Sequence, residues 1–130
     1  MIYKGFWEVQ TLPCNRPKLK KGVLFRKMRE QDRQNSIRLA LNPYAIIFRG
    51  NVGKVRLPDG RYFDTGLPKG FPDLFGFRKS DGKMIFLEVK TDKGRLREKQ
   101  AHFLDTMSQY PVIHGVARSD KEAIKIVLEG

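Results

Sequence analysis

The chain has 130 residues, enough for one domain built around a single hydrophobic core. Its 26 Lys and Arg residues outnumber its 14 Asp and Glu residues, which gives a formal net charge of +12 and a sequence pI of about 10.1. This excess favours a polyanionic partner over a neutral metabolite, with nucleic acid ahead of an anionic membrane surface.

Two classes of protein are disfavoured by the sequence. No apolar stretch reaches the roughly 18 residues that a membrane helix needs, and the N-terminal MIYKGFWEVQ lacks the continuous apolar core of a signal peptide. A single cysteine, Cys14, can form neither an internal disulfide nor a zinc site of several thiolates. We therefore expect a soluble, intracellular protein that does not contact a membrane.

The N-terminal part of the chain is basic, and a helix follows it. The segment TLPCNRPKLKKG is irregular and strongly basic, so residues 1–27 are predicted to form an arm and residues 28–130 the folded domain. Helical spacing over residues 26–42 predicts an amphipathic helix that ends at Asn42-Pro43. Its apolar stripe consists of Ile37, Ala40, Leu41 and Tyr44.

Two hairpins are expected next. Residues 44–63 are predicted to form a strand and a hairpin, because YAIIFRG is a short apolar run and a Pro-Asp-Gly turn separates two β-prone pieces. The strands PDLFGFR and KMIFLEVKT, joined by the turn sequence KSDG, predict the second hairpin.

The C-terminal part is predicted to be a helix, a strand and a helix. Residues 97–109 have a helical apolar stripe, and VIHGVA has the composition of a strand. The last helix is expected to begin at Ser119, where Ser-Asp-Lys-Glu forms a capping box. Its buried residues are expected to be Ala123, Ile124, Val127 and Leu128. The alternation of strands and helices predicts an α/β sheet with helices on its faces.

The second hairpin brings two acids together. Side chains alternate across a strand, so Glu88 and Lys90 share one face. A four-residue KSDG loop would place Asp73 directly opposite Glu88, whereas a two-residue loop at Asp81-Gly82 would leave the two acids as diagonal neighbours. In both registers the carboxylates converge on one face.

Convergent carboxylates suggest a metal site. Like charges that face each other destabilise a sheet unless one pKa rises or a cation intervenes. Mg²⁺ binds through one or two carboxylates while keeping waters and phosphate oxygens as further ligands. Asp73 and Glu88 are therefore candidate ligands, and Lys90 is a candidate to orient a water or to stabilise charge developing on a phosphate.

Two more polar residues lie on apolar helix stripes. Glu30 continues the stripe of the first helix and is a candidate third acid, while Gln100 lies on the stripe of the helix at 97–109. Each also has an ordinary explanation, as a surface acid and as an amide bonded to the backbone. Glu-x-Lys alone is common by chance, so only the convergence of these residues favours catalysis. His102 lies off the apolar stripe and His114 has no partner at metal-binding spacing, so both are expected to be structural or on the surface.

A phosphate-binding loop for a nucleotide is not expected. GNVGKV, residues 50–55, has glycines and Lys54 but lacks the Ser or Thr that follows the lysine in such loops, and no helix is predicted after it. We therefore expect no nucleotide cofactor.

GFPDLFGF and IFLEVKTDKGRLREKQAHFL resemble the PD-(D/E)XK nuclease superfamily and, within it, the VRR-NUC (virus-type replication-repair nuclease) family. Pro72-Asp73 and Glu88-Val89-Lys90 correspond to the superfamily motif. The family-specific parts are Gly-x-Pro-Asp at Gly70–Asp73, the GRL that follows the second strand, Gln100, and Glu-x-x-x-Gln at Glu30–Gln34. The resemblance covers about residues 28–130.

The resemblance implies a fold and a site. The fold would be a restriction-endonuclease-like α/β core with a mixed central sheet flanked by helices, in the order α-β-β-β-α-β-α. Asp73, Glu88 and the backbone carbonyl of Val89 would hold Mg²⁺ or Mn²⁺, and Lys90 would position the attacking water. Glu30, through a water, and Gln100 would support the metal and its waters.

The function that follows is a metal-dependent, structure-selective DNA endonuclease, similar to Holliday-junction resolvases. It would be a homodimer of the compact stand-alone type, phage-encoded and present in the host cytoplasm, that cuts branched double-stranded DNA. A sequence-specific or mobile-element nuclease acting on linear duplex, and a non-catalytic basic DNA-binding protein, are the alternatives. The residues expected to contact DNA are Lys18, Lys20, Lys21, Arg49, Lys54, Lys69, Lys93, Arg95 and Arg97.

Overall fold

The computed structural model describes residues 29–130, so the arm expected over residues 1–27 lies outside the described residues. The same holds for three of the expected DNA contacts, Lys18, Lys20 and Lys21. The described elements are α2 (Glu30–Leu41), β1 (Ala45–Arg49), β2 (Lys54–Arg56), β3 (Tyr62–Asp64), β4 (Leu74–Arg78), β5 (Met84–Val89), α3 (Glu98–Met107), β6 (Ile113–Ala117) and α4 (Asp120–Glu129).

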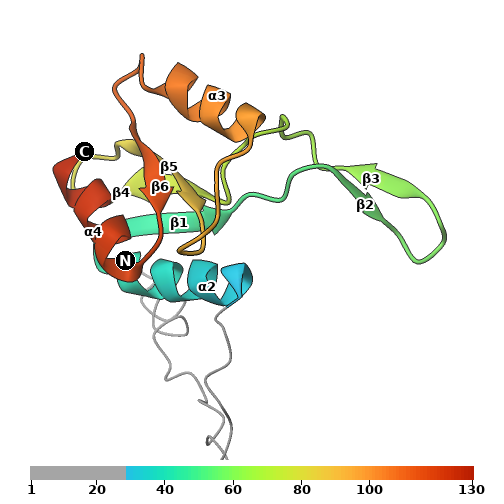
Figure 1. Cartoon of the computed structure of the whole chain (residues 1–130), viewed down its shortest axis with the longest axis horizontal. Coiled ribbons are helices and arrows are strands. Elements are labelled where there is room, and N and C mark those ends of the chain that lie inside the picture. The colour runs from blue at the N-terminus through green and yellow to red at the C-terminus, as the bar shows by residue number, and fades with distance from the viewer. Residues whose placement is uncertain (1–28) are drawn as a thin grey trace, which may run out of the picture.

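A mixed four-stranded sheet forms the centre of the fold, in the order β1-β4-β5-β6 (Figure 1). β5 and β6 are parallel, and the other neighbouring strands are antiparallel. Helices α2 and α4 lie on one side of the sheet and α3 lies on the other. The helices and the strands of this sheet follow one another as α-β-β-β-α-β-α, and the chain inserts β2 and β3 between β1 and β4 as a separate two-stranded sheet. None of the helices over residues 29–130 is long and apolar enough to cross a membrane.

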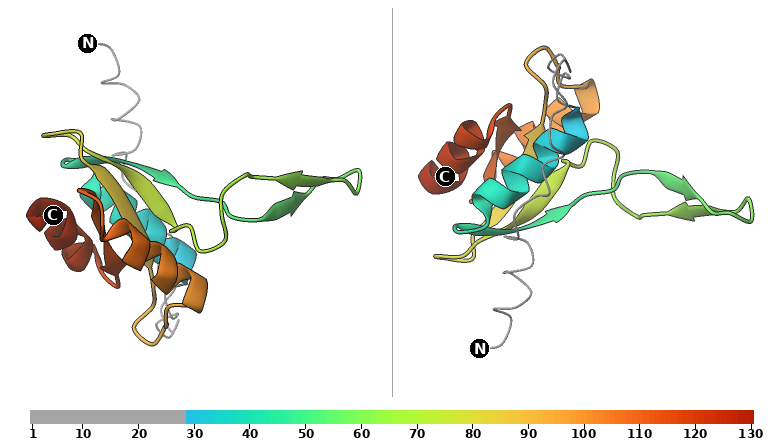
Figure 2. Two further views of the ribbon diagram at one scale, coloured as in Figure 1. Left: turned by 90° about the horizontal axis from the view of Figure 1, so that it is seen from above. Right: turned by 90° about the horizontal axis from the view of Figure 1, so that it is seen from below.

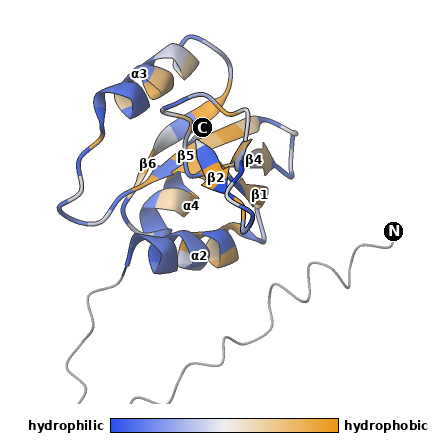
Figure 3. Cartoon of the chain, turned by 90° about the vertical axis from the view of Figure 1, so that its right-hand side faces the viewer, coloured by the Kyte–Doolittle hydropathy of each residue, from blue (hydrophilic) through white to orange (hydrophobic). Residues whose placement is uncertain are grey.

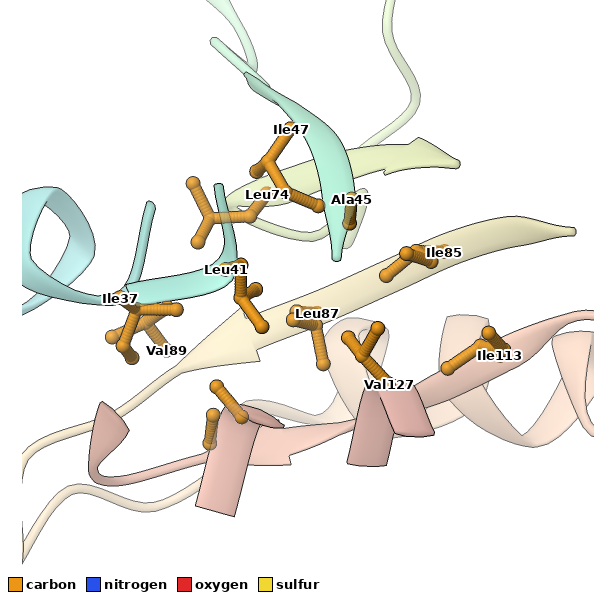
Figure 4. Packing of buried hydrophobic residues seen from close by; sticks show 12 residues of the cluster. Ile37, Leu41, Ala45, Ile47, Leu74, Ile85, Leu87, Val89, Ile113 and Val127 are labelled. Atoms are coloured by element: carbon orange, nitrogen blue, oxygen red, sulfur yellow. The ribbon is translucent and has the colours of Figure 1, made fainter. Parts of the chain in front are cut away.

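The hydrophobic core lies between the sheet and the pair α2 and α4 (Figure 4). Alternate residues of β5, namely Ile85, Leu87 and Val89, point to this side and are fully buried. They meet Ile37 and Leu41 of α2. Burial of each such side chain contributes roughly 1.5–3 kcal/mol, so these contacts fix which face of β5 points away from α2. Most other residues of α2 are hydrophilic, as the colouring of the helix shows (Figure 3).

The register between β4 and β5 is the one that a four-residue loop requires. Leu74 pairs with Leu87 and Phe75 with Phe86, and the Arg78 amide donates to the Lys83 carbonyl at 2.9 Å. Continuing this register by one residue places Asp73 opposite Glu88. The first of the two alternative registers is therefore confirmed.

The capping prediction for the last helix is also confirmed, whereas two apolar residues were placed wrongly. Ser119 accepts a hydrogen bond from the Glu122 amide at 3.1 Å, and Glu122 in turn accepts from the Arg118 amide. Tyr44 is 38% exposed because the helix ends at Leu41, so the helical spacing no longer applies to it. Leu128 is 53% exposed because α4 packs through the stripe that contains Val127.

The predicted first hairpin forms the two-stranded sheet β2–β3, called here the ribbon. Lys54 pairs with Asp64, Val55 with Phe63, and Arg56 with Tyr62, and all residues of both strands are exposed. The ribbon projects away from the main sheet and its helices (Figure 2).

Candidate active site

The two predicted acids lie on the α3 side of the sheet. Asp73 directly precedes β4, and Glu88 is the second-to-last residue of β5. The alternation that sends Leu87 and Val89 into the core sends Phe86 and Glu88 toward α3. Glu88 is 1% exposed, so its carboxylate is almost entirely removed from solvent.

The contacts of Glu88 leave one of its oxygens without a partner. Oε1 accepts a hydrogen bond from Nε2 of Gln100 at 2.8 Å and lies 3.5 Å from Nζ of Lys90. Oε2 is buried and has no hydrogen-bond partner among the described residues. A buried carboxylate oxygen without a donor costs free energy, which a bound cation would offset.

Burial raises the pKa of Glu88 to about 8. The neighbouring Asp73 carboxylate raises it further by charge repulsion, while the Lys90 ammonium acts in the opposite direction. Asp73 itself accepts a hydrogen bond from the Val89 amide through Oδ2, at 2.9 Å. Its carboxylate is thereby held at the end of β5, beside Glu88.

Lys90 follows β5 directly and is 7% exposed. Its amide donates to the Ala117 carbonyl at 3.1 Å, which extends the pairing with β6 by one residue. The side chain therefore stays on the face of Glu88, and its ammonium lies in a largely desolvated environment next to that carboxylate.

Gln100 links the first turn of α3 to Glu88. Its Oε1 accepts the Arg97 amide at 2.9 Å, as the third residue of a capping box. Because an amide proton can be accepted only by the oxygen of the side chain, Nε2 is turned toward Glu88. The predicted convergence of Gln100 with Glu88 is present in the structure.

A cluster of phenylalanines holds α3 above the sheet. Phe103 of α3 packs edge-on against Phe86 of β5 and against Phe71, with ring centroids 5.4 Å apart in both pairs. Phe71 also contacts Phe86 edge-on at 5.9 Å. Aromatic pairs in these arrangements contribute about 0.5–1.5 kcal/mol beyond their buried area, so the cluster fixes the height of α3 over Glu88.

Glu30 does not join this group. It begins α2, which covers the opposite side of the sheet, and its side chain is exposed. Within residues 29–130, no group of three or more His, Cys, Asp or Glu side chains is placed to hold a metal ion. The helix stripe on which Glu30 was predicted to lie packs on the core through Ile37 and Leu41. It also buries Gln34, which lies one helical turn after Glu30.

A cleft of about 540 Å³ opens beside the acids. Lys69 and Arg97, two of the expected DNA contacts, line it together with Asp73 and Gln100. Lys99, which the sequence analysis did not select, lines it as well. Its position next to Gln100, in the first turn of the helix, could have identified Lys99 as a residue of the cleft.

The remaining expected DNA contacts lie in three other places. Lys93 and Arg95 are exposed in the segment between β5 and α3, and Lys54 is on the ribbon. Burial lowers the pKa of Arg38 of α2, and the nearby charge of Arg49 lowers it further. Arg49 therefore faces the α2 side of the sheet rather than the side of Glu88, because it shares the face of Ala45 and Ile47.

Arg118 positions the segment that carries Lys93 and Arg95. Its guanidinium donates to the carbonyls of Thr91 at 2.6 Å and of Gly94 at 2.7 Å. This role could not be predicted from the sequence, because the partners are 27 and 24 residues away in the chain and no local motif marks the contact.

The residues present fit a divalent cation of the Mg²⁺ class. Two adjacent carboxylates, one with a buried oxygen that has no partner, are hard oxygen ligands in the number that such ions take from a protein. Their mutual repulsion, visible in the raised pKa of Glu88, would be relieved by a bound cation.

Comparison with protein families and with curated proteins bears on this site. Residues 60–121 match the family model of the VRR-NUC domain, which confirms the resemblance noted in the sequence and indicates a nuclease that acts on DNA. The matched span contains Asp73, Glu88, Lys90 and Gln100, and Glu30 lies outside it. No curated protein matches the chain.

Proposed function

We propose, from the VRR-NUC match at residues 60–121, that this protein is a metal-dependent, structure-selective DNA endonuclease with a PD-(D/E)XK site. The observation that carries the proposal is the opposition of Asp73 and Glu88 across the β4–β5 register, with Lys90 at 3.5 Å from Glu88. A sheet has no structural reason to place a carboxylate opposite a buried one.

The roles of the residues follow from their contacts. Asp73, Glu88 and the Val89 carbonyl would hold Mg²⁺ or Mn²⁺, which when bound polarises the phosphate and makes a coordinated water more acidic. Lys90 donates to the attacking water or to a phosphate oxygen on the same face. Gln100 holds Oε1 of Glu88, which leaves Oε2 directed at the cation.

Glu30 is not assigned a role in this site. It lies across the sheet from α3 with an exposed side chain, so a contact with the cation or its waters stays a prediction from the sequence alone.

The substrate we propose is branched double-stranded DNA bound by a homodimer, with one cut from each subunit. The support is the net charge of +12 and the basic residues Lys69, Arg97 and Lys99 around the cleft. Recognition would be of shape, because no helix within residues 29–130 resembles a base-reading helix.

The substrate is tested with a labelled four-way junction and a linear duplex of the same sequence, each with Mg²⁺, Mn²⁺ or EDTA. We expect paired, metal-dependent cuts in the junction and slow cutting of the duplex. Cleavage of the duplex at one defined sequence would favour the sequence-specific alternative. Tight binding of both DNAs without cutting in either metal would favour the non-catalytic alternative.

The assembly is tested by sedimentation velocity of the full chain, alone and with the junction. A species with the mass of two chains supports the homodimer. A single-chain species that still cuts both sides of the junction would contradict it.

A further inference from the structure

The ribbon has two distinct faces, neither of which packs on the rest of the described chain. Val55 and Phe63 are opposite each other on one face, and Arg56 and Tyr62 on the other. Phe63 is 59% exposed and Tyr62 is 66% exposed. Large apolar side chains exposed together on a projecting element mark an interaction surface rather than a packing element.

The stems of the ribbon are attached to the candidate active site. The Gly50 amide, just before the ribbon, donates to the Asp73 carbonyl at 2.8 Å. A Cβ on Gly50 would lie 2.5 Å from the Pro72 carbonyl oxygen, so only glycine permits this approach. Gly50 and Val52 on one stem and Lys69 on the other line the cleft that contains Asp73. The ribbon therefore rises from the rim of the site at a fixed position.

The exposed cations of the ribbon point to a nucleic-acid partner, although Lys54 lies opposite Asp64. Arg56 is exposed, and no ion pair within residues 29–130 neutralises it. Lys54 is exposed on the same face, and Lys69 follows at the base. Basic side chains interleaved with exposed aromatic rings are the combination that binds unpaired nucleic acid, because the rings stack on bases while the cations contact the phosphates.

We propose that the ribbon is a DNA-binding arm whose rings Tyr62 and Phe63 stack on unpaired bases a few base pairs away from the phosphate that is cut. Because the two rings lie on opposite faces, each can meet a base of a different strand where a duplex opens. The three-residue strands of the ribbon span roughly 10 Å at about 3.3 Å per residue, the length of roughly three base pairs of DNA. This inference rests on the proposed nuclease function and assigns the selectivity for branched or opened DNA to the ribbon.

The test measures binding of the full chain in EDTA by fluorescence anisotropy, so that cleavage plays no part. The DNAs are a fully paired duplex and the same duplex with a central unpaired bubble. The variants are the double substitution Tyr62→Ala with Phe63→Ala, and Tyr110→Ala as a control, because Tyr110 is also exposed, at 57%, but follows α3 rather than lying on the ribbon.

We expect the double variant to bind the bubble at least about tenfold more weakly than the unsubstituted protein and to bind the paired duplex within about threefold. Tyr110→Ala should match the unsubstituted protein on both DNAs. Equal affinity of the double variant and the unsubstituted protein for the bubble would overturn the proposal. Loss of dimer mass in the double variant, with unchanged preference for the bubble, would overturn it in favour of a second copy of the chain as the partner.

The test of nuclease activity and the test of the ribbon are independent, because the first measures cutting with metal and the second measures binding in EDTA. Absence of metal-dependent cutting by the unsubstituted protein would refute the function, while the binding contrast in EDTA would still decide the role of the ribbon.

Discussion

The Gln100 side chain bonds to two parts of the fold at once: its Nε2 donates to Glu88 at 2.8 Å, and its Oε1 accepts the Arg97 amide that begins α3. The helix start and the buried acid of β5 are therefore held in register by one amide. A change at this residue affects both the helix and the site.

Substitution of Gln100 separates these two roles. Gln100→Ala removes both bonds, so we expect a loss of about 1 kcal/mol in the free energy of unfolding and weaker Mn²⁺ binding. Gln100→Glu keeps an acceptor for the Arg97 amide, so the helix cap should survive. The new carboxylate lies against Glu88 and should raise the pKa of Glu88 further. Urea denaturation and Mn²⁺ titration of both variants check this. Equal Mn²⁺ affinity in Gln100→Ala and the unsubstituted protein would show that the bond to Glu88 does not orient the ligand.

The stability of the metal-free protein should depend on the protonation of Glu88. Its pKa is about 8 in the folded chain and 4.5 without the fold, so the folded state holds the proton more tightly. The free energy of unfolding should therefore fall as the pH rises from about 4.5 to about 8, and then level off. Urea denaturation in EDTA at a series of pH values across this range measures the free energy of unfolding.

The control for this pH dependence is Glu88→Gln, which has the same shape and cannot ionise. We expect the difference in stability between Glu88→Gln and the unsubstituted protein to grow through the same pH range, in favour of the variant. A difference that stays constant with pH would mean that Glu88 is not the titrating group.

Metal binding should release the proton from Glu88. Because a ligand carboxylate must be ionised, Mn²⁺ affinity should rise by up to about tenfold per pH unit below the pKa of about 8 and then become constant. Calorimetry in buffers with different ionisation enthalpies should detect close to one proton released at pH 7. Affinity that does not change with pH would indicate ligands that are already ionised.

Gly70 is placed where a side chain would displace the site. Its φ is +92°, and an added Cβ would lie 2.3 Å from the Lys99 carbonyl oxygen in the first turn of α3. Gly70→Ala should therefore move the helix start that carries Gln100, and weaken Mn²⁺ binding as well as stability. Gly53→Ala is the matched control, because Gly53 also has a positive φ, +103°, but has no atom within 4 Å of the added Cβ. It should show only the backbone cost of about 1–2 kcal/mol. Equal Mn²⁺ affinity in the two variants would contradict the contact.

The sequence was informative wherever a short segment determines its own geometry. The KSDG loop limited the register to two alternatives, both of which bring Asp73 and Glu88 to one face, and the capping box at Ser119 placed the start of α4. The alternation along β5 also separated the site face from the core face.

Features that depend on distant packing were not predictable. Helical spacing placed Glu30 on the sheet-facing stripe of α2, but it does not show that α2 lies across the sheet from α3. The contacts of Arg118 with Thr91 and Gly94 join segments from the two ends of a β-α-β unit, and no local pattern marks them. The projection of the ribbon is of the same kind, because the sequence predicts the hairpin but not what it packs against.

The central claim is that Glu88 and Lys90 make this domain a nuclease, and nicking of supercoiled plasmid tests it most directly. The unsubstituted protein should convert the plasmid to the nicked form in Mg²⁺ or Mn²⁺ and not in EDTA. Glu88→Gln and Lys90→Ala should lose at least about a hundredfold in rate while they still bind the plasmid. Nicking by Glu88→Gln at the rate of the unsubstituted protein, or in EDTA, would contradict the account.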